Sequence, residues 1–300
     1  MLKVGIVGKN HSKSYISLIN DCNYYELVGV FDPCFQFKTP KDFNQNLIYL
    51  SFEELIKQSE AIIFASPEKI YLPLIEMALK YSRPVFLHSI NNLSYQEQVQ
   101  LMKLREEAGG VLQIQQPIIF HNTFQQFINL SKKPLLLTYN YSNASEKKLL
   151  LKTRLIIGAV LSVFKTNLKK VTVNTISAFN EMPDIIKIRI DFDNGSVAEI
   201  IVNAIEKQNI NHVKCFEYNG FFDLDLIENS LVGQLNNNKV QHNTPIVDNT
   251  IQKIIGEQLS NFYFNVTNHK TPKNSIENEI VTQKVIEKVK EKLRISINIF

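Results

Sequence analysis

The chain has 300 residues, of which 44% are hydrophobic, and its 33 Lys and Arg against 29 Asp and Glu give a net charge of +4. This composition supports a buried core and excludes an intrinsically disordered chain, and the length predicts about two domains. The positive charges are scattered lysines rather than a stripe, so we expect no nucleic-acid partner.

The cysteines and the apolar runs bear on the compartment. Cys22, Cys34 and Cys215 lack the spacing of metal ligands, so they predict reduced thiols and no metal site. The apolar run at the start is too short for a signal peptide, and no stretch approaches the roughly 20 apolar residues of a membrane span. We therefore expect a cytoplasmic protein with no membrane partner.

The first part of the chain alternates short apolar strands with amphipathic helices. Strands are predicted at 2–7, 26–31, 61–65, 84–87 and 111–115. Helices are predicted at 11–19, from 51, at 72–80 and at 94–108, the second and fourth opened by capping boxes (Ser51 with Glu54, Ser94 with Glu97). This alternation predicts an α/β domain over residues 1–120 with a Rossmann-type, doubly wound parallel sheet.

The pattern changes after residue 120. One helix is predicted at 146–164, before strands at 169–177, 185–192, 196–204 and 213–218, and closing helices are predicted at 248–264 and 274–293. Asp193-Asn194-Gly195 is typical of a hairpin turn, and the Asn-rich stretch 236–243 predicts a surface loop. The sequence therefore predicts an α+β domain over 121–300, built on an antiparallel sheet.

The turn after the first strand is where a ligand is expected, because the carboxyl ends of parallel strands form the functional edge of such a sheet. It reads Gly8-Lys9-Asn10-His11-Ser12, where a dinucleotide fingerprint would read G-x-G-x-x-G, so only the first glycine is present. Asn10 tolerates a positive φ at some cost. The N–H groups of the following helix suit a phosphate, with the Ser12 hydroxyl as a further donor and His11 near the phosphates.

An acidic residue ends the second strand. Asp32 follows Gly8 by 24 residues, and the fingerprint places the acid that binds the ribose hydroxyls of NAD roughly 20 residues on. Its charge would also repel the additional phosphate of NADP. The alternative is that Asp32-Pro33 forms only a turn.

Three segments resemble the Gfo/Idh/MocA family of NAD(P)-dependent oxidoreductases. Residues 26–33 (ELVGVFDP) resemble the second strand of that family, Ala65-Ser66-Pro67 stands at its Thr-Pro position, and residues 191–198 (DFDNGSVA) resemble a hairpin of its second domain. The resemblance implies a Rossmann domain followed by an open-faced, mainly antiparallel sheet. It also implies an NAD cofactor bound in part by Ser66 and Pro67, and a sugar or sugar-like hydroxyl as substrate.

The residues that perform the chemistry in that family are replaced here. Ser89 stands in place of the lysine of the family's Glu-Lys-Pro motif, and residues 151–157 contain no counterpart of its histidine. His88 and His121 lie at predicted carboxyl ends of strands, so either histidine, with Ser89 nearby, is a candidate for the base that hydroxyl oxidation needs. The alternatives are structural histidines and a catalytically inactive relative that binds a nucleotide or sugar ligand or pairs with an active paralogue.

The open sheet implied by the resemblance would need a cover. Apolar residues that include candidates for this face are Val171, Ile188, Ile190, Val197 and Ile201. Because a large uncovered apolar face marks an interaction site, we expect a homo-oligomer formed through the sheet of the second domain.

Overall fold

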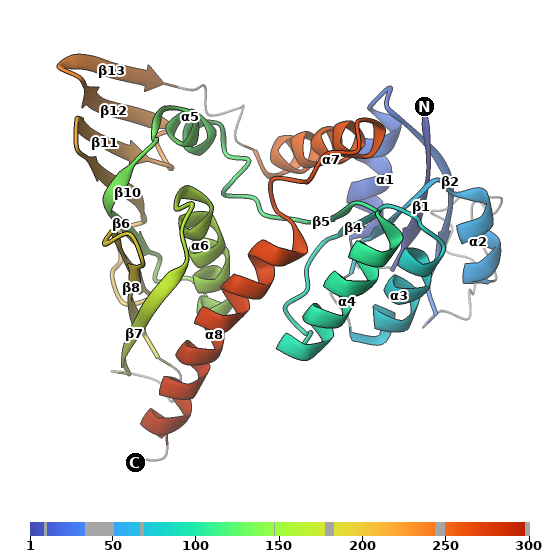
Figure 1. Ribbon diagram of the computed structural model, residues 1–300, viewed down its shortest axis with the longest axis horizontal. Coiled ribbons are helices and arrows are strands. Elements are labelled where there is room, and N and C mark those ends of the chain that lie inside the picture. Colours follow the sequence, from blue (N-terminus) through green and yellow to red (C-terminus); the bar gives the residue numbers. More distant parts are fainter. Residues whose placement is uncertain are drawn as a thin grey trace. The chain divides into compact units, whose positions relative to one another are not determined.

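The computed structural model describes residues 1–8, 11–33, 51–66, 69–146, 148–177, 183–243 and 250–297, with side chains up to residue 293. The chain forms two compact units (Figure 1). One unit comprises Met1–Gln115 and Ile255–Ile280, and the other comprises Gln116–Ile254 and Val281–Phe300. The sequence-based division at residue 120 placed residues 255–280 in the second domain, whereas here they return to the first unit.

The first unit is built on a parallel sheet of five strands in the order β2-β1-β3-β4-β5. The strands are β1 (Leu2–Val7), β2 (Tyr25–Phe31), β3 (Ala61–Phe64), β4 (Val85–Leu87) and β5 (Leu112–Ile114). All five predicted strands are therefore confirmed. In this order the chain changes direction across the sheet between β1 and β3, where α/β folds bind ligands.

Helices cover both faces of this sheet. They are α1 (Ser12–Asn20), α2 (Phe52–Gln58), α3 (Leu72–Lys80), α4 (Tyr95–Ala108) and α7 (Ile251–Thr267), with a short 3₁₀ helix, η2 (Lys69–Tyr71). Successive strand residues point to opposite faces. Ile62 accordingly packs in the core formed with α2, α3 and α4, whereas Ile63 packs in the core formed with α1 and α7. The predicted doubly wound arrangement is confirmed.

Local sequence signals explain where the helices begin and end. In α4, Ser94 and Glu97 form the reciprocal capping box, and Gly109 ends the helix in the left-handed region with φ +60°. At the start of α2, the Ser51 hydroxyl oxygen accepts a bond from the Glu54 N–H. These contacts satisfy backbone groups that helix ends leave without partners.

Buried amides attach residues 255–280 to the first unit. The Gln113 side chain on β5 donates to the Gln258 carbonyl at 3.0 Å and accepts from Asn265 at 3.2 Å. The Asn274 side chain donates to the Ile114 carbonyl at 3.1 Å. Because burial of an amide without hydrogen-bond partners costs free energy, these bonds hold residues 255–280 against β5.

The second unit is built on a sheet of eight strands in the order β13-β12-β11-β10-β6-β9-β8-β7. The strands are β6 (Pro134–Ser142), β7 (Leu168–Ile176), β8 (Ile185–Phe192), β9 (Val197–Asn203), β10 (Ile210–Glu217), β11 (Gly220–Asp225), β12 (Ser230–Leu235) and β13 (Asn238–Asn243). The β6–β9 pair is parallel and the other neighbours are antiparallel. The mainly antiparallel second sheet is confirmed.

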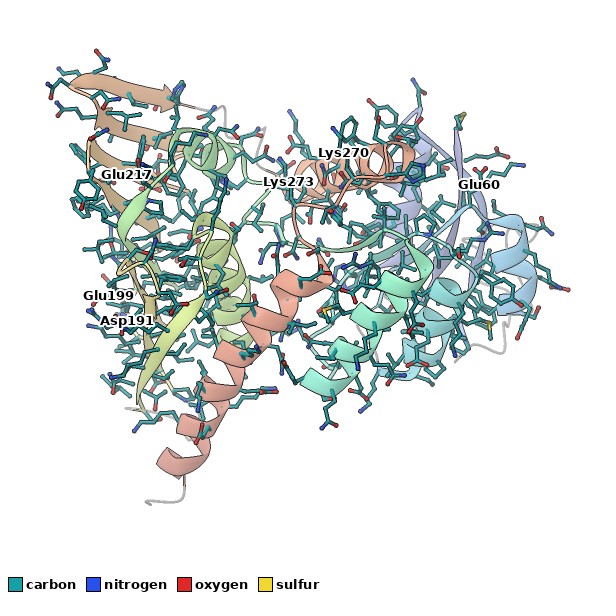
Figure 2. All side chains as sticks on the ribbon, viewed as in Figure 1. Glu60, Asp191, Glu199, Glu217, Lys270 and Lys273 are labelled. Carbon is teal, nitrogen blue, oxygen red and sulfur yellow. The ribbon has the colours of Figure 1, made fainter. Side chains whose placement is uncertain are left out.

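Helices lie on one side of this sheet (Figure 1). They are α5 (Asn122–Leu130), α6 (Leu149–Val163) and the part of α8 (Ile276–Ile297) that belongs to this unit. Figure 2 shows Asp191 and Glu199 on the side away from α6, and Arg189 bonds to both at 3.0 Å. The described helices thus leave one face of the sheet uncovered.

The predicted members of the uncovered face belong to two different faces. Ile188 and Ile190 are fully buried in the core, and Val171 packs against that core. Val197 and Ile201 lie on the uncovered side, where they pair with Asp191 and Lys187 of β8. The prediction combined residues of both faces because successive residues of a strand point to opposite faces, so an error of one residue changes the face.

Several elements of the second unit were missed or misassigned. The Asn-rich stretch is not a loop: Asn236 and Asn237, with φ of +50° and +64°, form a turn between β12 and the edge strand β13. Asparagine tolerates this left-handed conformation. The prediction of one helix before the strands was also wrong, since α5 precedes α6, and β6, β11 and β12 were not anticipated. Among the described residues, no helix is both long and apolar enough to cross a bilayer.

Candidate functional site

Gly8 and Asp32 lie side by side at the carboxyl edge of the first sheet. The N–H of Gly8 donates to the Phe31 carbonyl at 2.9 Å, and Val7 pairs with Phe31 in the parallel register of β1 and β2. Asp32 therefore follows the strand next to the one that leads into Gly8, and the residue is only 5% exposed. The pairing that the spacing predicted, a turn glycine with an acid on the next strand, is formed.

The turn at Gly8 requires glycine for two separate reasons. Its φ of +97° lies in the region that L side chains rarely adopt. A Cβ there would also lie 2.7 Å from the Ser66 hydroxyl oxygen and 2.9 Å from the Ser66 Cβ. Ser66 lies just beyond the end of β3. The turns after β1 and β3 therefore approach each other closely, at the point where the chain changes direction across the sheet.

The start of α1 has the character of an anion-binding helix end. His11 is its N-cap residue and makes no side-chain cap bond to the first turn. Ser12 is buried and Lys13 is exposed. Because the N–H groups of a first helical turn favour negative charge, this end suits a phosphate.

Four residues singled out in the sequence lie outside the described part of the structure. They are Lys9, Asn10, Cys34 and Pro67. The predicted cofactor contacts of Lys9, Asn10 and Pro67 therefore stay predictions.

His88 follows β4 at the same edge and stacks on His11. The ring centroids are 4.2 Å apart and the ring planes differ by 19°. Burial, and secondarily the charge of His11, lower the pKa of His88 to about 4. The half-buried ring is therefore neutral near neutral pH and keeps a lone pair for a proton.

Tyr15 and Gln115 extend this cluster. The Tyr15 hydroxyl lies 3.0 Å from Nδ1 of His88 and 3.4 Å from Oε1 of Gln115. Burial raises the pKa of Tyr15 well above its usual value, so the hydroxyl stays protonated. Tyr15 falls within the predicted helix 11–19 and Gln115 ends the predicted strand 111–115, but neither residue was predicted to belong to a site. The one signal in the sequence was the position of Gln115 at the carboxyl end of the fifth strand.

Ser89, which the resemblance places at the position of the family's lysine, takes part in a turn. Its hydroxyl oxygen accepts a bond from the Asn91 N–H at 3.2 Å. The partner in that bond is a backbone N–H, which cannot take the hydroxyl proton, and a serine hydroxyl by itself has a low affinity for a proton. This bond gives Ser89 a part in shaping the turn after β4, and its predicted catalytic role stays a prediction.

His121 lies in the second unit and has its own environment. It precedes α5, and its Nε2 lies 3.1 Å from the Leu226 carbonyl oxygen. A carbonyl only accepts, so Nε2 carries the proton in this contact. Burial lowers the pKa of His121 to about 4. Within their own units, His88 joins a cluster with His11 and Tyr15, whereas His121 is held by Leu226.

The described residues of the first unit fit a dinucleotide in three respects. Gly8 gives the tight turn at the switch point, Asp32 places a carboxylate at the neighbouring strand end, and α1 begins with no cap bond from the side chain of His11. These are the features that bind the pyrophosphate and ribose in doubly wound folds. The first unit therefore keeps these three features although the fingerprint lacks two of its glycines.

No protein-family model and no curated protein matches the sequence. Solved structures do match. UDP-N-acetylglucosamine 3-dehydrogenase GnnA from Acidithiobacillus ferrooxidans aligns at 13% identity over 99% of both chains, with a TM-score of 0.81. An oxidoreductase from Agrobacterium radiobacter, in complex with NAD+, L-tartaric acid and magnesium, aligns at 12% identity over 98% of this chain and 96% of its own, with a TM-score of 0.83.

A third match is biliverdin reductase from Synechocystis sp. PCC 6803, in complex with biliverdin and NADP+. It aligns at 13% identity over 97% of this chain and 98% of its own, with a TM-score of 0.69. The protein thus has the two-domain fold of Gfo/Idh/MocA-type dehydrogenases, and the resemblance is confirmed at the level of the fold.

Proposed function

We propose that the protein is an NAD-dependent oxidoreductase that acts on a sugar or sugar-like hydroxyl. The observation that carries this proposal is the close approach of the Gly8 turn to Ser66, with Asp32 at the neighbouring strand end. In this proposal the first domain binds the dinucleotide and the second domain contacts the substrate. The shared fold with solved dehydrogenases supports the reaction class.

Asp32 supports NAD over NADP as the cofactor. A buried carboxylate at the end of β2 accepts hydrogen bonds from ribose hydroxyls, as in other dinucleotide sites. The same charge repels the phosphate that distinguishes NADP. One solved structure of this fold holds NAD+ and another holds NADP+, so the fold alone does not select between them.

A polar, hydroxyl-bearing substrate is supported by the matched structures. One is named for its action on UDP-N-acetylglucosamine, and another was solved with L-tartaric acid. A bound nicotinamide would accept the hydride from the carbon that bears the hydroxyl. The protein must then take the hydroxyl proton, and His88 is the candidate base of the first unit because its ring is neutral near neutral pH.

Transfer of an isotopic label tests the reaction directly. Protein is incubated with NADH that carries deuterium at its transferable position and with keto forms of sugars and sugar nucleotides, and the products are analysed by mass spectrometry. We expect deuterium in one product class, lost in His88→Ala and kept in His242→Ala, which changes an exposed histidine of β13. NADH binding without transfer to any of these compounds would favour the alternative below.

The alternative function is a catalytically inactive relative that binds a nucleotide or sugar ligand or pairs with an active paralogue. Two observations favour it. Ser89 uses its hydroxyl oxygen in a turn contact, and His121 uses its Nε2 proton on the Leu226 carbonyl. In that case the dinucleotide site would serve binding alone.

We also propose a cytoplasmic homo-oligomer that forms through the uncovered face of the second sheet. On this face, apolar side chains of β10, β11 and β12 are exposed: Phe216 is 42%, Phe221 38% and Val232 43% exposed. Each of the three residues stands next in its strand to a residue that is buried in the core. Because successive strand residues point to opposite faces, the three side chains lie on the uncovered face. Free thiols at Cys22 and Cys215 are consistent with the proposed compartment.

A further inference from the structure

A chain of hydrogen bonds runs from β5 to the end of β4 through the first helix. Gln115 Oε1 lies 3.4 Å from the Tyr15 hydroxyl, which lies 3.0 Å from Nδ1 of His88. Backbone bonds hold both ends of this chain: the His88 N–H donates to the Phe64 carbonyl, and the Gln115 N–H donates to the Leu87 carbonyl, each at 2.9 Å. The sheet itself therefore sets the positions of the two outer groups.

The number of protons in this chain fixes the direction of its bonds. The Tyr15 hydroxyl has one proton to donate, and the amide oxygen of Gln115 can only accept. The hydroxyl therefore donates to Gln115 Oε1, and its oxygen is left to accept. Both bonds form together only when Nδ1 of His88 carries a proton and donates it to the Tyr15 oxygen. A neutral His88 ring with its proton on Nδ1 has its lone pair on Nε2.

We propose that Tyr15 and Gln115 are positioning residues that hold His88 in the Nδ1–H tautomer, so that Nε2 accepts the hydroxyl proton of the substrate. This inference rests on the proposed function. The O–H bond of the substrate would break with its proton going to Nε2, and the carbon that bears the hydroxyl would give its hydride to a bound nicotinamide, so that the C–OH group becomes a carbonyl. The imidazolium then releases its Nε2 proton to water.

The surroundings of the ring explain why such a chain is needed. Burial and the neighbouring His11 disfavour the imidazolium, which by itself makes His88 a weak base. The Tyr15 oxygen favours the imidazolium by accepting from Nδ1–H, and Gln115 keeps the Tyr15 proton turned away from that bond. Among the described residues, the titratable groups in ring contact or hydrogen-bond contact with His88 are His11 and Tyr15, both at the start of α1.

Nitrogen NMR of the imidazole rings reads the tautomer without any cofactor. In the wild-type protein near neutral pH, we expect the His88 signals of the Nδ1–H form. Tyr15→Phe and Gln115→Leu should shift these signals toward the Nε2–H form and lower the titration midpoint of His88. Gln115→Glu keeps an oxygen acceptor and should keep the Nδ1–H form. Tyr25→Phe is the matched control, because it removes an equally buried hydroxyl that donates to the Leu259 carbonyl.

Turnover and binding complete the test. Tyr15→Phe should lower kcat by about 10-fold or more and leave the affinity for NADH unchanged, because only proton transfer is affected. The inference is overturned if wild-type His88 has the Nε2–H form, as it would with the amide nitrogen of Gln115 facing Tyr15, or if Tyr15→Phe leaves the tautomer unchanged. Absence of NADH binding with the Nδ1–H form intact would instead overturn the proposed function and the role of Nε2 with it.

Discussion

A methyl group added at Gly8 would lie 2.7 Å from the hydroxyl oxygen of Ser66. The turns that follow β1 and β3 therefore approach each other closely. These are the two strands between which the chain changes direction across the sheet. Only a residue without a Cβ allows the turns to meet in this way. The single glycine left from the dinucleotide fingerprint therefore stands at a position that requires glycine.

Gly8→Ala should destabilise the protein and abolish dinucleotide binding. Gly195→Ala is the matched control, since Gly195 also has a positive φ, +82°, but nothing lies within 4 Å of its Cβ position. Both variants carry the left-handed strain of roughly 1–2 kcal/mol, and Gly8→Ala adds overpacking of about 1–3 kcal/mol. Urea unfolding measures the difference. Equal losses in the two variants would show that the Ser66 contact does not constrain the turn.

Asp32→Ser should reduce the preference for NADH over NADPH. The substitution removes the carboxylate that binds the ribose hydroxyls and repels the additional phosphate, so affinity for NADH falls while affinity for NADPH rises or stays level. Calorimetric titration with each cofactor measures the ratio of the two affinities. Asp21→Ser, which changes an exposed carboxylate at the end of α1, should leave this ratio at the wild-type value. An unchanged ratio in Asp32→Ser would contradict the assigned role of Asp32.

Acid should weaken the fold between about pH 6.5 and pH 4. Burial lowers the pKa of His88 and of His121 to about 4, whereas an unfolded histidine titrates near pH 6.5. In this window the unfolded chain binds more protons than the native one, so the free energy of unfolding falls as the pH falls. Urea titrations at pH 7 and pH 5 measure the loss. His88→Asn and His121→Asn should each reduce it, and the exposed His242→Asn should not.

Phe221→Glu should dissociate the proposed oligomer. Phe221 lies on the uncovered face of the second sheet, where a carboxylate would place a charge in the apolar part of the proposed interface. Ile251→Glu changes an exposed apolar residue at the start of α7, which is not a strand of that sheet, and should leave assembly intact. Light scattering of the wild-type protein and the two variants measures the molar mass of each and so shows whether the oligomer forms. A wild-type protein that is already monomeric would contradict assembly through this face.

The first unit could be predicted from the sequence because its signals are local. Apolar strand runs, the Ser94 capping box and Gly109 each act within a few residues of their own position. The return of residues 255–280 could not be predicted in this way, because it depends on long-range bonds of buried amides such as Gln113 with Gln258. A single buried glutamine carries no pattern that reveals its partner.

The candidate site was predictable in part for the same reason. The spacing of Gly8 and Asp32 follows from two strands that pair in register, so it is visible in the sequence. The cluster around His88 combines residues from α1, the end of β4 and the end of β5, which come together only when the sheet forms. The second sheet was harder to predict, since short strands such as β12 and β13 depend on turn residues like Asn236 rather than on apolar runs.

Titration of the wild-type protein with NADH, followed by nicotinamide fluorescence, tests the central claim most directly. That claim is that the edge formed by Gly8, Ser66 and Asp32 binds a dinucleotide. We expect saturable binding of one NADH per chain, lost in Gly8→Ala and weakened in Asp32→Ser. A wild-type protein that binds no NADH at millimolar concentration would contradict it.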